Sequence, residues 1–207
     1  MTDTSSRKQT QAEKAYQALR QRLLASSLKP GLRLNEYYWA QEFKVNRGDI
    51  RQALARLFAD GLVEKGAKKG FLVRSYSTND IKHLNETRFV LETAAAHLAV
   101  ERATKQDIKR LKETCYLMRK MAENQCTLGL CETDVLFHNQ FMEAAHNPKL
   151  VDVYQRASIP ITALVLINGQ TESQKLIQDT QQHEKITAAL KKKQLKFLVS
   201  LLKQMLG

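Results

Sequence analysis

Residues 45–74 contain the pattern that most restricts how this chain can fold. Asn46 is a suitable helix N-cap, and Asp49 lies three residues later, where an acidic group favours a helix N-terminus. The helix that follows places its apolar residues on one face and ends at Gly61, which can adopt the left-handed C-cap conformation. Two short strand-like segments then flank a basic turn, 66–70, that begins and ends with glycine. The pattern predicts a helix followed by a β-hairpin.

Two further helices are predicted before this helix and hairpin. Apolar residues recur at helical spacing over 11–26, Pro30 and Gly31 then break the chain, and a short helix follows at about 36–43. Three helices followed by a basic hairpin form a winged helix-turn-helix. We assign this domain to residues 8–75.

Positive charge is concentrated in this part of the chain. Residues 1–75 contain 15 Lys and Arg against 7 Asp and Glu, whereas residues 76–207 contain 18 against 14. The whole chain carries a formal net charge of +12. This asymmetry indicates a polyanionic partner, with nucleic acid first and an anionic membrane surface second. A basic but merely solvated surface is the alternative that charge alone leaves open.

The start of the third helix carries the residues expected to read DNA. A helix-turn-helix lays its second helix in the major groove, and the N-terminal residues of that helix contact base edges. Arg47 and Arg51 lie there, four residues apart and off the apolar face, and arginine can pair bidentately with guanine. The other residues assigned to the DNA interface are Arg33, Asn46, Gly48, Lys68, Lys69 and Gly70. A winged helix that contacts proteins, with solvated arginines, is the alternative.

Three segments of this domain, 28–36, 45–57 and 60–63, resemble the DNA-binding domain of GntR-type bacterial transcription regulators. The family pattern is PGxRL, then VSRxxVRxAL, then GLV before the wing. The chain departs from the family at Trp39, Asn46, Gly48, Asp49 and Gln52. Because Asp49 would repel phosphates mildly, we expect an unusual operator preference.

Residues 76–207 are predicted to form an all-α bundle, so that the chain as a whole is mainly α. Helices are expected at about 77–103, 104–122, 132–146, 148–168, 171–190 and 192–206. The Cys-containing stretch 123–131 is predicted to be a loop.

Several features indicate a cytoplasmic protein without a membrane partner. The polar N-terminus does not resemble a signal peptide, and no apolar run is long enough to span a bilayer. The cysteines, Cys115, Cys126 and Cys131, are odd in number and lack paired metal-ligand spacing. Reduced thiols are therefore expected.

The second domain resembles the effector domain of the FadR subfamily, called the FCD domain. The segments that carry this resemblance are 77–81, 86–92, 134–138, 147–150 and 183–186. The resemblance implies a helical bundle whose central pocket holds a metal ion and a small carboxylate effector. It also implies that Arg88 faces this pocket and binds the carboxylate, which we favour over a simple pair between Arg88 and Glu92, four residues later.

The spacing of Asp134 and His138 places both side chains on one helix face. Carboxylate oxygen and imidazole nitrogen suit Zn²⁺, Ni²⁺, Mn²⁺ or Fe²⁺. The resemblance adds His183 as a third ligand and puts Met205 where the family has a fourth, histidine ligand. A thioether is a poor ligand for these ions, although water or an effector carboxylate could complete the sphere. A polar pocket without metal is the alternative.

Together these features predict a sequence-specific DNA-binding transcription regulator, a repressor that acts as a homodimer on an inverted-repeat operator in double-stranded DNA. A small organic acid in the pocket is expected to modulate DNA binding. An architectural DNA-binding protein with a vestigial pocket is one alternative. A metal-dependent enzyme is less favoured, because no general base or co-substrate site accompanies the Asp and His residues, and we predict no enzymatic activity.

Overall fold

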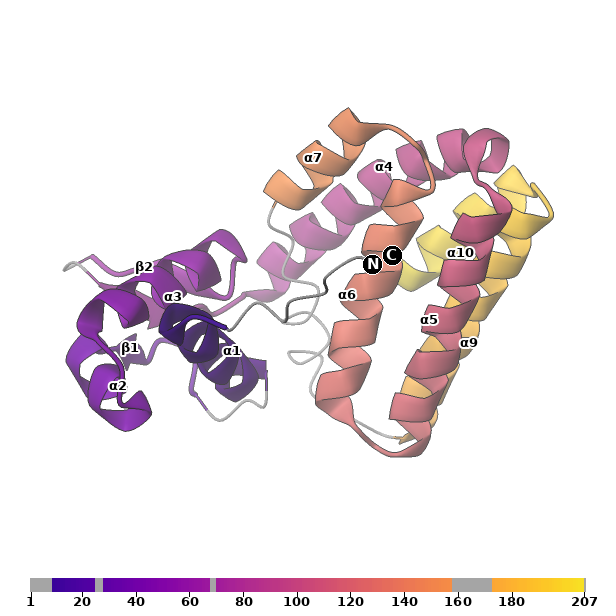
Figure 1. The fold of residues 1–207 in the computed structure, drawn as a ribbon. Coiled ribbons are helices and arrows are strands. Elements are labelled where there is room, and N and C mark those ends of the chain that lie inside the picture. Colours follow the sequence, from indigo (N-terminus) through magenta and orange to yellow (C-terminus); the bar gives the residue numbers. More distant parts are fainter. Residues whose placement is uncertain (1–8, 25–27, 68–69, 158–172, 207) are drawn as a thin grey trace, which may run out of the picture. The chain divides into compact units, whose positions relative to one another are not determined.

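The computed structural model describes residues 9–24, 28–67, 70–157 and 173–206. The chain divides into two compact units, Met1–Ser75 and Tyr76–Gly207. Figure 1 shows the elements of both. None of the helices described has the length and apolar character needed to cross a membrane.

The first unit is a winged helix-turn-helix, as predicted. Its elements are α1 (Gln11–Leu24), β1 (Arg33–Leu34), α2 (Glu36–Phe43), α3 (Arg47–Ala59), β2 (Val63–Lys65) and β3 (Phe71–Val73). Helix α3 packs against α1, α2 and β2. The predicted apolar stripe of α3, which includes Ile50, Leu54 and Leu57, is buried. The opposite face of α3 is therefore left exposed.

The wing is a three-stranded antiparallel sheet with the order β1-β3-β2. The hairpin of β2 and β3 confirms the prediction, with Glu64 opposite Leu72. Strand β1 was not predicted, because two residues are too short to show the alternation that identifies a strand. Pairing of β1 with β3 places Arg33 opposite Leu72. Arg33 is thereby attached to the wing rather than to the loop before α2.

The N-termini of α2 and α3 have separate caps. The side chain of Asn35 accepts hydrogen bonds from the backbone N–H groups of Tyr37 and Tyr38, at 2.8 and 3.1 Å. Asn46 is the N-cap of α3, and its backbone N–H donates to the Asp49 carboxylate at 3.2 Å. Asp49 thus has a local role in starting α3, which accounts for an acidic residue at the edge of a basic surface.

The second unit is an all-α bundle, as predicted. Its helices are α4 (Thr78–Arg102), α5 (Lys105–Glu123), α6 (Thr127–Glu143), α7 (Pro148–Arg156), α9 (Ser173–Lys191) and α10 (Leu195–Leu206). Helix α5 packs against α6 and α9, and α10 packs against α4 and α9 (Figure 1). Helix α6 also contacts α4 and α7, so it is surrounded by helices from several parts of the unit.

The prediction of a loop over 123–131 is confirmed only for residues 124–126, and it was wrong for the remainder because α6 begins at Thr127. Leu130 and Cys131 are buried in the bundle, and burial of their side chains outweighs the low helix propensity of Gly129. A Cβ at Gly129 would collide with the side chain of Met121 on α5, so glycine allows the two helices to approach closely. The helix predicted at 148–168 ends earlier, since α7 stops at Arg156 with Ala157 as its C-cap, and residues 158–168 lie outside the described residues.

Asp107 fixes the turn that follows α6. It is buried, and its carboxylate accepts hydrogen bonds from the Thr104 backbone N–H at 2.9 Å and from Arg110 at 2.7 Å. His146, in the turn between α6 and α7, donates to the same carboxylate at 2.8 Å. Burial raises the pKa of Asp107, but these donors outweigh it and hold the pKa below its usual range.

Replacing this carboxylate should loosen the turn. Asp107→Ala should lower the free energy of unfolding by about 2 kcal/mol, because a cap and a buried hydrogen-bond acceptor are lost together. A carboxyl whose pKa is lowered by folding stabilises the protein above its unfolded pKa, and this contribution disappears as the pH falls through the folded pKa. The difference between variant and wild type should therefore shrink below about pH 4. Urea unfolding followed by circular dichroism measures both effects.

Glu113→Ala is the matched control, since Glu113 lies on the same helix in an exposed pair with Lys109. It should leave the unfolding curve almost unchanged. Equal losses in the two variants would contradict the role given to Asp107.

Candidate functional site

The DNA-reading surface predicted for the first unit lies on the exposed side of α3 and on the wing. Arg47 and Arg51 are 63% and 64% exposed at the start of α3, as the apolar stripe predicted. Asn46 and Gly48 are also exposed at this end of the helix. The guanidinium groups are therefore available to a partner in solution.

Arg33 lies close to the wing tip. A Cβ built on Gly70 would lie 3.8 Å from the Arg33 guanidinium, and the φ of +106° at Gly70 is one that glycine favours. Lys68 and Lys69 lie outside the described residues. Arg33 thus brings a cation from β1 to the wing, which could not be inferred without the β1–β3 pairing.

One residue on this surface was not predicted. Glu36, the first residue of α2, pairs with both Arg47 and Arg51. The only sequence signal is an acidic residue eleven positions before an arginine, which carries no recognisable spacing. Only the packing of α2 on α3 reveals the contact.

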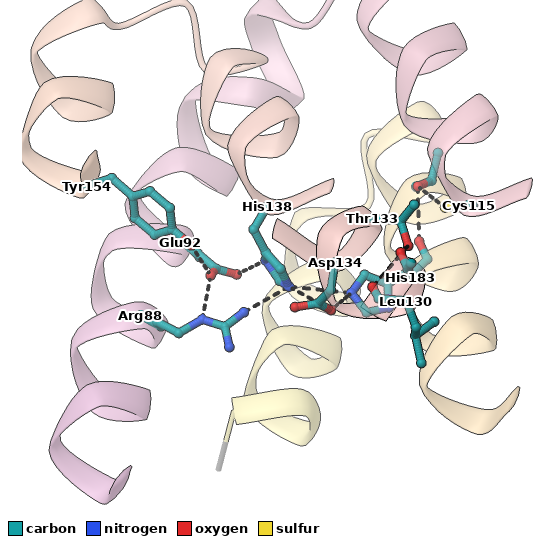
Figure 2. Close-up of polar contacts among 11 residues, drawn as sticks. Arg88, Glu92, Cys115, Leu130, Thr133, Asp134, His138, Tyr154 and His183 are labelled. Carbon is teal, nitrogen blue, oxygen red and sulfur yellow. Dashed lines mark hydrogen bonds and ion pairs between the residues drawn. The ribbon is translucent and has the colours of Figure 1, made fainter. Parts of the chain in front are cut away.

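The second unit contains a buried cluster of charged and polar residues, shown in Figure 2. Its members come from four helices: Arg88 and Glu92 from α4, Asp134 and His138 from α6, Tyr154 from α7, and His183 from α9. Glu92 and His138 are 0% and 1% exposed. Such groups are stable in a protein interior only when they are paired or hydrogen-bonded.

Glu92 is the central acceptor of the cluster. Its Oε1 accepts from Arg88 Nε at 3.1 Å and from the Tyr154 hydroxyl at 3.0 Å, and its Oε2 lies 3.0 Å from His138 Nδ1. Burial alone would raise the pKa of Glu92, but His138 and Arg88 outweigh it and hold the pKa at about 2. The carboxylate is therefore charged in the physiological range.

These contacts determine the tautomer of His138. Arg88 Nη2 lies 2.8 Å from His138 Nε2, and a guanidinium can only donate. His138 Nε2 must then accept, which leaves Nδ1 to carry the proton donated to Glu92. A histidine oriented in this way presents a lone pair at Nε2, as metal-binding histidines do.

The predicted metal ligands do meet. Asp134 Oδ1 lies 3.1 Å from His183 Nε2 and 3.8 Å from His138 Nε2, and the two Nε2 atoms are 3.4 Å apart. In a tetrahedral site with bonds of about 2.1 Å, neighbouring ligand atoms lie about 3.4 Å apart. Burial raises the pKa of Asp134, but the two histidines and Arg88 outweigh it and keep the pKa below its usual range. The donor set fits a divalent metal ion.

Arg88 contacts one of the three predicted ligands, His138. Its Nη2 takes the His138 lone pair that a metal ion would need, so Arg88 and a cation compete for His138. Arg88 forms the pair with Glu92 that the sequence left open, and it also contacts His138 in the cluster. Its binding of a carboxylate stays a prediction. Its Nη1 makes no hydrogen bond to the described residues.

Met205, at the position of the fourth ligand, lies near the end of α10 and packs against the bundle core. Of the other histidines, His83 and His97 are exposed on α4, and His146 binds Asp107. None of these three joins the metal cluster formed by described residues.

Comparison with known proteins agrees with both units. The family model for bacterial regulatory proteins of the gntR family matches residues 11–73, and the FCD domain model matches residues 83–207. The chain is 32% identical over 163 residues to the Nta operon transcriptional regulator of Aminobacter aminovorans, covering 78% of this chain and 75% of that protein. It is 28% identical over 143 residues to the galactonate operon transcriptional repressor of Escherichia coli, covering 60% of each.

A solved structure has the same fold. Escherichia coli McbR/YncC superimposes with a TM-score of 0.77 at 22% identity, over 96% of this chain and 94% of that one. The relatives compared are transcriptional regulators rather than enzymes. With a gntR-type winged helix and an FCD domain in one chain, this protein belongs to the FadR subfamily of GntR transcriptional regulators.

Proposed function

We propose that the protein is a ligand-responsive repressor that binds an inverted-repeat operator as a homodimer in the cytoplasm. The observation that carries the effector proposal is a buried arginine, Arg88, one of whose amino groups receives no hydrogen bond partner from the described residues, beside a set of metal-ligand side chains. A guanidinium and a bound divalent cation together select a small carboxylate. The effector is therefore a small organic acid.

The residues of the cluster would have different roles. Asp134, His138 and His183 would hold a divalent metal ion, and that ion would supply positive charge to a carboxylate oxygen. Glu92 keeps the His138 lone pair directed at the site. Arg88 must release His138 before a cation can bind there, and its Nη2 would then be free for the same carboxylate. Metal and effector binding would consequently support each other.

The DNA side of the proposal rests on α3 and the wing. Arg47 and Arg51 would read bases in the major groove, while Asn46 and Gly48 at the helix start, with Arg33, Lys68, Lys69 and Gly70 at the wing, would contact phosphates or the groove. Two copies related by two-fold symmetry would bind two half-sites. In this proposal the first domain, residues 8–75, reads DNA. The second domain, residues 76–207, binds the effector and forms the dimer.

Arg47→Ala should remove most of the discrimination between an operator and random DNA. A bidentate arginine–guanine contact is worth about 1–3 kcal/mol of discrimination, so the ratio of affinities should fall by about 10-fold or more. The operator is obtained by selecting duplexes from a random library with the wild-type chain. Fluorescence anisotropy at fixed salt then measures both affinities.

Lys14→Ala is the control, because Lys14 is an exposed cation on α1 beside Glu13, which pairs with Arg56 in the last turn of α3. It should change the two affinities by similar factors. Unchanged discrimination in Arg47→Ala would remove Arg47 from base recognition.

Asp134→Asn should lower the metal content of the purified chain. The neutral amide is a weaker ligand than the carboxylate, so metal binding should weaken by about 10-fold or more. Elemental analysis after dialysis against a defined Zn²⁺ concentration provides the measurement. Asp152→Asn is the control, because the Asp152 side chain on α7 is partly exposed and pairs with Arg156, and this variant should bind as much metal as wild type. Equal metal in Asp134→Asn and wild type would reject the site.

Arg88→Lys should separate metal binding from the effector response. The lysine keeps a cation beside Glu92 but cannot form the two-nitrogen contact to a carboxylate. We expect metal content at or above the wild-type level and loss of the effect of small carboxylates on operator binding. A panel of mono- and dicarboxylates, tested by fluorescence anisotropy, measures this. A wild-type response retained by the variant would contradict the role of Arg88.

A further inference from the structure

We propose that Glu36 is a specificity-determining residue that orients the two DNA-reading arginines, Arg47 and Arg51. The inference rests on the proposed recognition role of these arginines and adds a residue that does not itself read a base. It is carried by the contacts between the start of α2 and the start of α3.

Glu36 is held where it can act on both arginines. Its Oε1 accepts from Arg51 Nε at 3.3 Å, and its Oε2 accepts from Arg51 Nη2 at 2.9 Å. The same Oε2 lies 3.7 Å from Arg47 Nη2. The Glu36 side chain is 22% exposed, whereas the arginines are more than 60% exposed. The Glu36 carboxylate thus lies on the protein side of the two arginines, and their guanidinium groups lie on the solvent side.

The carboxylate is not needed to begin α2. Asn35 already accepts from the N–H groups of Tyr37 and Tyr38, and so provides the side-chain cap. Instead, both carboxylate oxygens of Glu36 accept hydrogen bonds from Arg51, which lies on another helix. The hydrogen bond to Arg51 also outweighs desolvation and lowers the pKa of Glu36, so the carboxylate is charged at neutral pH.

The edge of Arg51 that Glu36 occupies decides what remains for DNA. A guanidinium has two faces suited to bidentate contact, one formed by Nε and Nη2 and the other by Nη1 and Nη2. Glu36 takes the first, so the second is directed away from the protein. That second edge matches the O6 and N7 acceptors of guanine. Because the side chain is already ordered, less rotamer entropy is lost on base contact.

The same carboxylate opposes non-specific binding. Affinity for any DNA sequence depends on cations near phosphates, and a negative charge among those cations weakens it. A correctly placed guanine offsets this loss by its bidentate contact, whereas a wrong base does not. Glu36 therefore lowers affinity for random DNA and raises the ratio of operator to random affinity.

The test compares Glu36→Gln with wild type on two duplexes: one selected from a random library by the wild-type chain, and a scrambled duplex of the same composition. Glu36→Gln should bind the scrambled duplex about 2- to 5-fold more tightly, since one opposing charge is gone. Its ratio of selected to scrambled affinity should fall about 10-fold, because the arginines are no longer oriented. Fluorescence anisotropy at fixed salt measures both affinities.

Two further variants separate charge from positioning. Glu42→Gln removes the same charge from the same helix, where Glu42 pairs with Arg22 at 2.9 Å, and it should keep the wild-type ratio. Glu36→Asp keeps the charge but is one methylene too short to hold Arg51 through both nitrogens. It should retain the wild-type affinity for the scrambled duplex and lose part of the ratio.

Two results would overturn the assignment of Glu36. The first is a Glu36→Gln ratio within twofold of wild type, which together with a lowered melting temperature would mean that Glu36 only joins α2 to α3. The second is an equal ratio loss in Glu42→Gln. If the wild-type chain itself binds both duplexes alike, the proposed sequence-specific function fails instead, so the two failures are distinguishable.

Discussion

The buried carboxylate of Glu92 is the interaction on which the helical unit depends. It accepts hydrogen bonds from Arg88 on its own helix, His138 on α6 and Tyr154 on α7, and so ties three helices together in the interior. A buried carboxylate without such donors would be strongly destabilising. Its donors in turn acquire fixed orientations. His138 Nε2 accepts from Arg88 as a result, and it lies 3.8 Å from Asp134 Oδ1 and 3.4 Å from His183 Nε2.

The two units use the same physical device for different partners. In the buried cluster, Glu92 holds Arg88 through Nε, and Nη1 contacts no acceptor in the part of the chain that the structure describes. On the exposed start of α3, Glu36 holds Arg51 through Nε and Nη2. In each case a carboxylate orders a long, flexible cation and determines which of its edges faces a ligand. The partner that we propose in both places is an anion: a small carboxylate inside the bundle, and nucleic acid at α3.

Much of the fold could be predicted because local signals agree with the tertiary structure. The cap at Asn46, the apolar stripe of α3 and the glycine-bounded turn together specify the winged helix. Strand β1 and the start of α6 were missed, because their stability comes from partners distant in sequence. Two residues of β1 form a strand only beside β3, and α6 includes Gly129 because Leu130 and Cys131 are buried in the bundle.

The sequence by itself determined the family, the two domains, the outward direction of Arg47 and Arg51, and the Asp134–His138 pair, since these depend on residue type and helical spacing. Tertiary structure decided the rest. It brought His183 from α9 to within hydrogen-bonding distance of Asp134, placed Arg88 on the His138 lone pair, and set Glu36 behind the arginines. Contacts between side chains on different helices depend on how those helices pack, and no spacing along the chain encodes that distance.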